Sequence, residues 1–118
     1  MKTRRVVQVL DLYDEPEMIA TYRRIHSEAE MWPEIVAGIR ECGILEMELY
    51  IERNHLVMIC DVPEDLDWQA AMDKMAILPR QAEWEAYVGK YQVCPEGARS
   101  DEKWHKAEKM FHLYDFKK

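Results

Sequence analysis

The sequence lacks the features that several large classes of protein need. Its 118 residues contain three cysteines, an odd set without C-x-x-C spacing, which argues against a disulfide framework and a structural zinc site. No segment approaches the roughly 18 uninterrupted apolar residues of a membrane span. Gln8 and Asp11 interrupt the apolar run that follows the basic start, so the N-terminus does not resemble a signal peptide. We therefore expect a soluble cytoplasmic protein.

Positive charge is also scarce. The 16 basic residues face 23 acidic ones, giving a net charge of −7, and they are scattered instead of forming a stripe. This distribution disfavours nucleic acid and anionic membranes as partners. The sequence has no phosphate-binding P-loop, no dinucleotide fingerprint and no cluster of His and Cys residues, so we expect neither a nucleotide cofactor nor a metal.

The hydrophobic content of 48% is enough for one ordinary core, and the chain shows no internal repeat, so we expect a single domain over residues 1–118. Alternating or continuous apolar residues predict strands at 4–13, 44–52, 56–62 and 108–116. Helices are predicted at 17–28, 33–43, about 65–78 and 79–90. The supporting signals are prolines in first turns, Asp65 or Asp67 as an N-cap, and Gly43 as a left-handed C-cap.

The order of these elements is strand, broken helix, strand, strand, broken helix, strand. Two β-α-β halves of this kind predict a ferredoxin-like α+β sandwich, a four-stranded antiparallel sheet with helices on one face. The continuous apolar run at 56–62 predicts a central strand. The other face of the sheet needs a cover, and at this size we expect a homodimer, a dimeric α/β-barrel type of assembly.

The first predicted helix places Tyr22 and His26 four residues apart, on one face. Both protonation states of an imidazole are accessible near neutral pH, and a phenol beside it can hold a hydroxyl or relay a proton. The pair is a candidate for acid-base chemistry, although such a pair more often reflects packing at a helix edge. The rest of the sequence has to decide between these interpretations.

An ordered set of motifs adds to this pair. A first strand leads to Y-x-x-x-H, then to W-P-E, a helix closed by glycine, a strand pair and a later helix that carries a tryptophan. The residues are Tyr22, His26, Trp32, Pro33, Glu34, Gly43 and Trp84. This set resembles the L-rhamnose mutarotase family over nearly the whole chain, from about residue 7 to residue 116.

The resemblance implies a cofactor-free 1-epimerase that interconverts the α and β anomers of a deoxyhexose, on the fold predicted above and as a dimer. His26 then corresponds to the proton donor and Tyr22 to a substrate-binding hydroxyl. Trp84 becomes an aromatic wall against the apolar face of the sugar, with Trp32 as a second candidate platform. Anomer exchange already occurs in water, so acid-base groups alone can supply the acceleration.

The sequence departs from the family pattern at positions that would contact the sugar. Glu85 stands where a second tryptophan is expected, Met47 stands where a tyrosine is usual, and the spacing from His26 to Trp32 is one residue longer. We keep Met47 and Glu85 as candidate substrate-binding residues. The departures leave the choice between L-rhamnose, L-fucose and another deoxyhexose open.

Two other functions fit the same fold. One is a cofactor-free monooxygenase, which would need a roomy apolar pocket, and the other is a non-catalytic module that binds a small molecule. The other notable residues have ordinary interpretations. We expect core or dimer contacts for Trp68 and Trp104, capping for Glu34 with a second carboxylate role as the alternative, and solvated or structural positions for His55, His105 and His112. We expect the eight methionines to fill the core and the three cysteines to be buried and inert.

Overall fold

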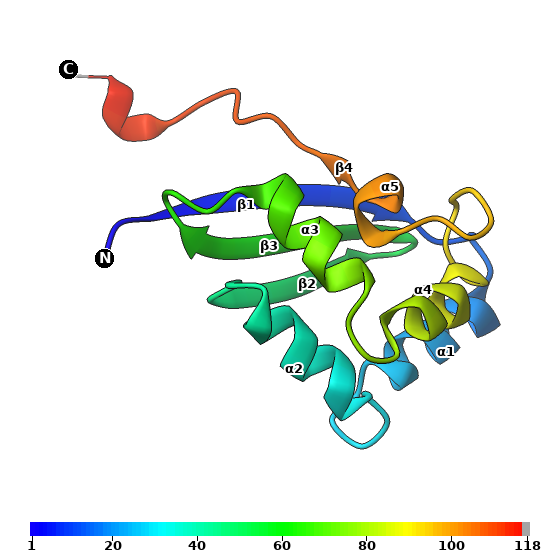
Figure 1. The fold of residues 1–118 in the computed structure, drawn as a ribbon. Helices are drawn as coiled ribbons and strands as arrows, with labels where there is room; N and C mark the ends of the chain where they lie inside the picture. Colours follow the sequence, from blue (N-terminus) through cyan, green and yellow to red (C-terminus); the bar gives the residue numbers. More distant parts are fainter. Residues whose placement is uncertain (117–118) are drawn as a thin grey trace.

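The computed structural model describes residues 1–116, in which four strands form one antiparallel sheet in the order β2-β3-β1-β4 (Figure 1). The strands are β1 (Thr3–Asp11), β2 (Glu46–Glu52), β3 (His55–Pro63) and β4 (His105–Lys106). β3 lies between β2 and β1, as its continuous apolar run predicted. This strand order, with helices between the strands, confirms the ferredoxin-like α+β fold.

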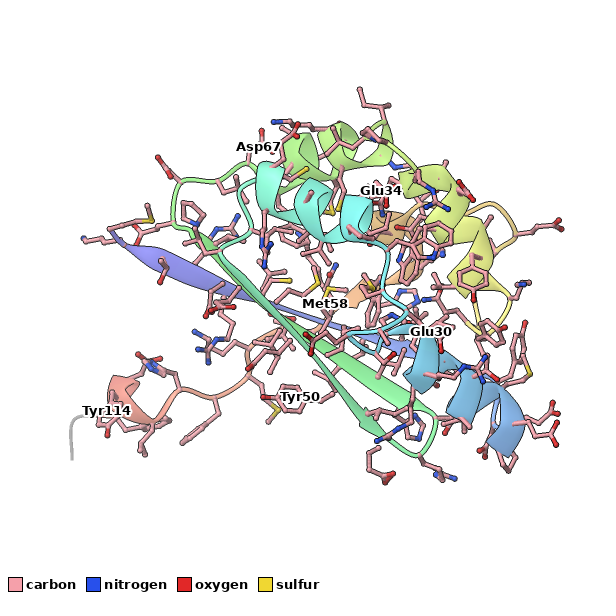
Figure 2. The ribbon with its side chains drawn as sticks, turned by 90° about the horizontal axis from the view of Figure 1, so that it is seen from below. Glu30, Glu34, Tyr50, Met58, Asp67 and Tyr114 are labelled. Atoms are coloured by element: carbon pink, nitrogen blue, oxygen red, sulfur yellow. The ribbon has the colours of Figure 1, made fainter. Side chains whose placement is uncertain are left out.

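The main helices cover one face of this sheet, whereas Tyr50 lies on the other face (Figure 2). They are α1 (Pro16–Ile25), α2 (Pro33–Glu41), α3 (Trp68–Ala76), α4 (Gln81–Gly89) and the short α5 (Ser100–Lys103). Most of the predicted punctuation is confirmed: Asp67 caps α3 by accepting from the backbone N–H of Ala70, and Gly43 follows α2 with φ +93°. The helix predicted to start at Pro79 begins instead at Gln81, after Arg80 in the left-handed region. Among the described residues, no helix is long and apolar enough to cross a membrane.

The core lies between the sheet and the helices. Alternate residues of β1 and β3 point into it, and α3 and α4 supply large side chains from the opposite side. The buried members that form this contact are Val6, Leu10, Leu56, Met58, Cys60, Val62, Trp68, Met72, Met75 and Trp84. The outer face of the sheet, defined by Val7, Val9, Tyr50, Val57 and Ile59, is apolar and only partly covered.

The prediction of a strand at 108–116 is wrong. The ladder with β1 is formed by His105–Lys106 and extended only by the Ala107 N–H, which donates to the Val7 carbonyl at 2.8 Å. Beyond it the chain leaves the sheet as an arm that ends in a 3₁₀ turn, η1 (Leu113–Asp115) (Figure 1). An alternating apolar pattern specifies a strand only where one face is buried, and the described residues do not cover this segment.

Three smaller expectations also need correction. α1 ends at Ile25 instead of residue 28, for a reason given with the site below. Two methionines do not fill the core, since Met1 and Met110 are exposed. Cys42 and Cys60 are buried as expected, whereas Cys94 is only half-buried.

Candidate active site

The C-terminal end of α1 places an imidazole against its own helix. The backbone N–H of His26 donates to the Arg23 carbonyl, three residues back, so it does not occupy the Tyr22 carbonyl. The His26 ring takes this acceptor instead, because Nδ1 donates to the Tyr22 carbonyl at 2.8 Å. The side chain thus competes with the next turn of helix, which explains why α1 stops earlier than predicted.

This hydrogen bond fixes the proton arrangement of His26. A carbonyl only accepts, so Nδ1 carries the proton and Nε2 of the neutral ring carries a lone pair. Partial burial lowers the pKa of His26 below its ordinary value of 6.5, against the opposing effect of the Tyr22 carbonyl. Within residues 1–116, Nε2 has no hydrogen-bond partner. His26 is therefore neutral at pH 7 and can accept a proton at Nε2.

Tyr22 is buried beside this imidazole, with 4.4 Å between the ring centroids. Its hydroxyl accepts a hydrogen bond from Nε2 of Gln92 at 3.0 Å. Burial raises the pKa of Tyr22 to about 12, although the Gln92 hydrogen bond acts in the opposite direction. The phenol therefore keeps its proton at neutral pH and can donate one hydrogen bond of its own.

His26 lines three neighbouring depressions. The inner cavity, of about 70 Å³, is bounded by Tyr22, His26, Met47, Trp84 and Glu85 among others. The outer hollow, of about 440 Å³, opens between α2 and β2 next to His26 and Met47, with Arg40 and Glu46 at its edge. A third depression of about 210 Å³ lies on the other side of His26, towards Leu49 and Tyr50. The inner cavity is smaller than a typical ligand pocket of roughly 300–1,000 Å³, whereas the outer hollow, which shares His26 and Met47 with it, lies within that range.

Aromatic rings form one wall of the inner cavity. Trp84 is buried and meets His26 edge-on, with centroids 5.4 Å apart. Trp32 packs behind it: its ring lies 5.1 Å from Trp84, stacks on Tyr87 at 5.4 Å and carries the guanidinium of Arg80 at 4.0 Å. Trp84 faces the cavity, whereas Trp32 is not among the residues that line it.

A polar cluster, defined here as Gln81, Glu85, Gln92 and Lys103, lies next to Tyr22, and all of its members except Lys103 also line the inner cavity. The Lys103 ammonium is 1% exposed and donates to the Glu85 carbonyl at 2.7 Å and to Oε1 of Gln92 at 2.9 Å. It also pairs with the Glu85 carboxylate at 3.0 Å. The second carboxylate oxygen of Glu85 accepts from Gln81 at 2.6 Å. The chain thus buries an ion pair and two amides next to the candidate site.

The sequence matches a known protein family over most of its length. The family model described as L-rhamnose mutarotase matches residues 5–113. The chain belongs to this family. The resemblance drawn from the Tyr22, His26 and Trp84 motifs is therefore confirmed.

One curated relative supports the family, and two solved structures share the fold. An L-fucose mutarotase from Xanthomonas campestris pv. campestris is 39% identical, over 96% of this chain and 90% of that protein. The crystal structure of L-rhamnose mutarotase from Formosa agariphila superposes with a TM-score of 0.67 at 18% identity, over 93% of this chain and 98% of that one. Tetracenomycin F2 cyclase from Streptomyces glaucescens has a TM-score of 0.52 at 18% identity, over 92% and 95%. The two structures show the shared fold.

The predicted site residues of this mutarotase-family chain lie in three places. Tyr22, His26, Met47, Trp84 and Glu85 all line the inner cavity. Trp32 supports Trp84 from behind, and Glu34 stands in the first turn of α2 with an ion pair to Arg80 at 3.5 Å. The remaining histidines, His55, His105 and His112, are exposed, and Trp68 and Trp104 are buried in the core as expected.

Sequence reasoning missed the rest of the polar cluster. Gln81, Gln92 and Lys103 are at most 4% exposed, yet each stands in a stretch that resembles an ordinary solvated surface. One signal was available: a carboxylate at position 85, where the family pattern has an aromatic ring, requires a buried cation or a path to solvent. Lys103 supplies that cation.

Proposed function

We propose that this chain interconverts the α and β anomers of a deoxyhexose and that His26 moves the proton. The isomerase class predicted from the sequence is confirmed by the family and its mutarotase relatives. The monooxygenase and the non-catalytic module are not favoured. The observation that carries the proposal is the lone pair of His26 Nε2 at the junction of the inner cavity and the outer hollow.

The reaction can run on this one imidazole. Nε2 takes the proton of the C1 hydroxyl as the bond between C1 and the ring oxygen breaks and the C1 carbonyl forms. The imidazolium then gives the same proton to the ring oxygen, which leaves the open aldehyde and a neutral His26. After rotation about the C1–C2 bond, the reverse sequence closes the ring with the other configuration at C1. His26 thus accepts first and then acts as the proton donor that the resemblance implies.

The sugar is proposed to sit in the outer hollow with its C1 end at His26. The volume of the inner cavity, about 70 Å³, suits the reacting end and not a whole hexose ring. Trp84 and Met47 offer apolar surface to the deoxy carbon, while Arg40 and Glu46 at the edge can hydrogen-bond hydroxyl groups. L-Rhamnose and L-fucose are both candidates, because the family and the 39% identical relative are named for different sugars.

The test is exchange NMR on equilibrated L-rhamnose and L-fucose. We expect the wild type to accelerate anomer exchange of at least one sugar, and His26→Ala to lose the acceleration. His55→Ala is the matched control, because His55 is exposed on the β2–β3 hairpin, bonds Asp11 at 2.8 Å and should leave the rate unchanged. If the wild type does not accelerate anomer exchange of any deoxyhexose, the proposed function is wrong.

We further propose a cytoplasmic homodimer that covers the outer face of the sheet with a second copy. An apolar centre formed by Val9, Val57 and Ile59, next to the exposed ion pair of Arg5 and Asp61, has the apolar core and polar rim typical of protein interfaces. Three free cysteines are consistent with a reducing compartment.

The oligomer is tested by light scattering. Ile59→Glu places a charge in the proposed interface and should give monomers. Ile77→Glu is the control, because Ile77 is 85% exposed at the end of α3 and lies off this face. A wild type that is monomeric at high protein concentration contradicts the proposed dimer and leaves the proposed reaction unaffected.

A further inference from the structure

The polar cluster next to Tyr22 has a fixed hydrogen-bond polarity. A protonated lysine has three N–H donors and no acceptor, and Lys103 uses all three: on the Glu85 carbonyl, on the Glu85 carboxylate and on Oε1 of Gln92. A buried cation held in this way cannot present an acceptor to any neighbour.

This polarity passes through Gln92 to Tyr22. Because Lys103 only donates, the amide of Gln92 must turn its oxygen towards Lys103 and its NH₂ group towards the Tyr22 hydroxyl, as the structure has it. The phenol oxygen therefore accepts from Gln92, and the phenol proton is left for another partner. Tyr22 and Gln92 both line the inner cavity, so the hydrogen bond between them lies at the cavity wall, and we infer that an acceptor bound there takes this proton.

We propose that Lys103, acting through Gln92, is a positioning residue that holds the Tyr22 hydroxyl as a hydrogen-bond donor to the substrate. This inference rests on the proposed function and deepens it. The site then presents two groups of opposite polarity, a donor at Tyr22 and an acceptor at Nε2 of His26. The ring oxygen of a sugar has no proton, whereas the C1 hydroxyl has one. The pair thus orients the sugar with its ring oxygen at Tyr22 and its C1 hydroxyl at His26.

The sharpest test reverses the polarity with an isosteric change. In Gln92→Glu, one carboxylate oxygen keeps the bond to Lys103, and the other accepts from Tyr22, whose proton then turns away from the cavity. We expect kcat/KM for anomer exchange to fall roughly tenfold, the size of one hydrogen bond between uncharged groups, and to match that of Tyr22→Phe. In the Tyr22→Phe background, Gln92→Glu should cause no further fall.

A purely structural role for the cluster predicts another pattern. Gln92→Glu would then keep the wild-type rate, or it would lower the rate equally with Tyr22 and with Phe at position 22, and either result overturns the proposal. Lys103→Met frees the amide to turn either way, so we expect a smaller fall than in Gln92→Glu, again absent in the Tyr22→Phe background. A fall that persists there contradicts the inference.

A second readout needs no sugar and no catalysis. The intensity ratio of the tyrosine Raman doublet is higher for a phenol that accepts a hydrogen bond than for one that only donates. The Tyr22 contribution, isolated by subtracting the spectrum of Tyr22→Phe, should fall from wild type to Gln92→Glu. An unchanged ratio overturns the polarity, whatever the enzyme assay gives. If the ratio falls but no deoxyhexose is turned over, the polarity stands and the proposed function fails.

Discussion

Two regions meet at Tyr22, and they differ in burial and in hydrogen bonding. At its hydroxyl, the polar cluster is at most 13% exposed at any side chain and has donors and acceptors matched around Lys103. At its carbonyl, His26 is half-buried, bonded through one nitrogen only and open to the outer hollow. A matched, buried network holds one arrangement, whereas an imidazole with a spare lone pair can exchange a proton. The first region should therefore govern stability and orientation, and the second the rate.

The largest expected effect on rate comes from the open region. In His26→Asn, the side chain can still donate to the Tyr22 carbonyl but cannot accept and return a proton. We expect the acceleration of anomer exchange to fall by about 10²- to 10⁴-fold, with little change in the melting temperature. Exchange NMR and calorimetry on one preparation measure both quantities. A large loss of stability with a retained rate would reverse the comparison between the two regions.

The largest expected effect on stability comes from the polar cluster. Lys103→Met leaves the Glu85 carboxylate nearly buried without its cation, and breaking a buried pair from one side costs about 3–5 kcal/mol. Lys103→Met/Glu85→Met removes both charges and should recover much of that free energy of unfolding. Urea titrations measure the free energy of unfolding of the wild type, the single variant and the double variant. Equal stability of the single and double variants would mean that the pair is not the source of the cost.

The sequence predicted the open region better than the polar cluster, and the reason is physical. Tyr22 and His26 lie one helical turn apart, so a local spacing was enough to bring them together. Gln92 meets Tyr22 across 70 residues of sequence, Lys103 meets Gln92, and nothing local marks a lysine as buried. The sequence therefore predicted the part of the site that lies within one helix, and it did not predict the residues brought there from elsewhere in the chain.

The fold shows the same division. Alternation and punctuation located β1, β2, β3 and the four larger helices. All of these except β2 bury residues in this chain's own core, and β2 has half-buried residues on its inward side. The segment 108–116 has the alternation of a strand, but its large apolar side chains are exposed and nothing within residues 1–116 buries them. The strand that actually pairs with β1 at this edge, β4, has two residues, which are too few to show an alternation of apolar and polar side chains. An alternating apolar pattern therefore did not predict the strand correctly at 108–116, because a strand also needs a neighbouring surface that buries one of its faces.

The pH dependence sharpens the comparison further. Burial lowers the pKa of His26, so the acid limb of kcat/KM should lie below pH 6.5, with the rate falling as the pH drops through that pKa and Nε2 becomes protonated. The free energy of unfolding should fall at higher pH than the rate does, from about pH 6.5 down to the lowered pKa of His26, because the unfolded chain takes up this proton at a higher pH than the folded one. His55→Ala should leave the rate limb in place. An acid limb at or above pH 6.5 would contradict the buried, neutral imidazole.

The smallest expected effect belongs to the aromatic wall. Trp84→Phe keeps a ring beside His26 but removes part of the surface offered to the sugar. We expect KM to rise about two- to tenfold with kcat nearly unchanged, in line with the roughly 0.5–1.5 kcal/mol of one aromatic contact. Trp32→Phe is the matched control, since Trp32 does not line the inner cavity, and its effect should be smaller still. A larger effect from Trp32 would move the sugar to the other side of Trp84.

The central claim is that His26 rests as a neutral ring with its proton on Nδ1 and its lone pair on Nε2. Long-range ¹⁵N NMR on protein labelled at histidine tests it most directly, with His26→Asn identifying the resonances. At neutral pH the account predicts a protonated Nδ1 and an unprotonated Nε2. A proton on Nε2, either in the other neutral form or in a charged ring, would contradict it.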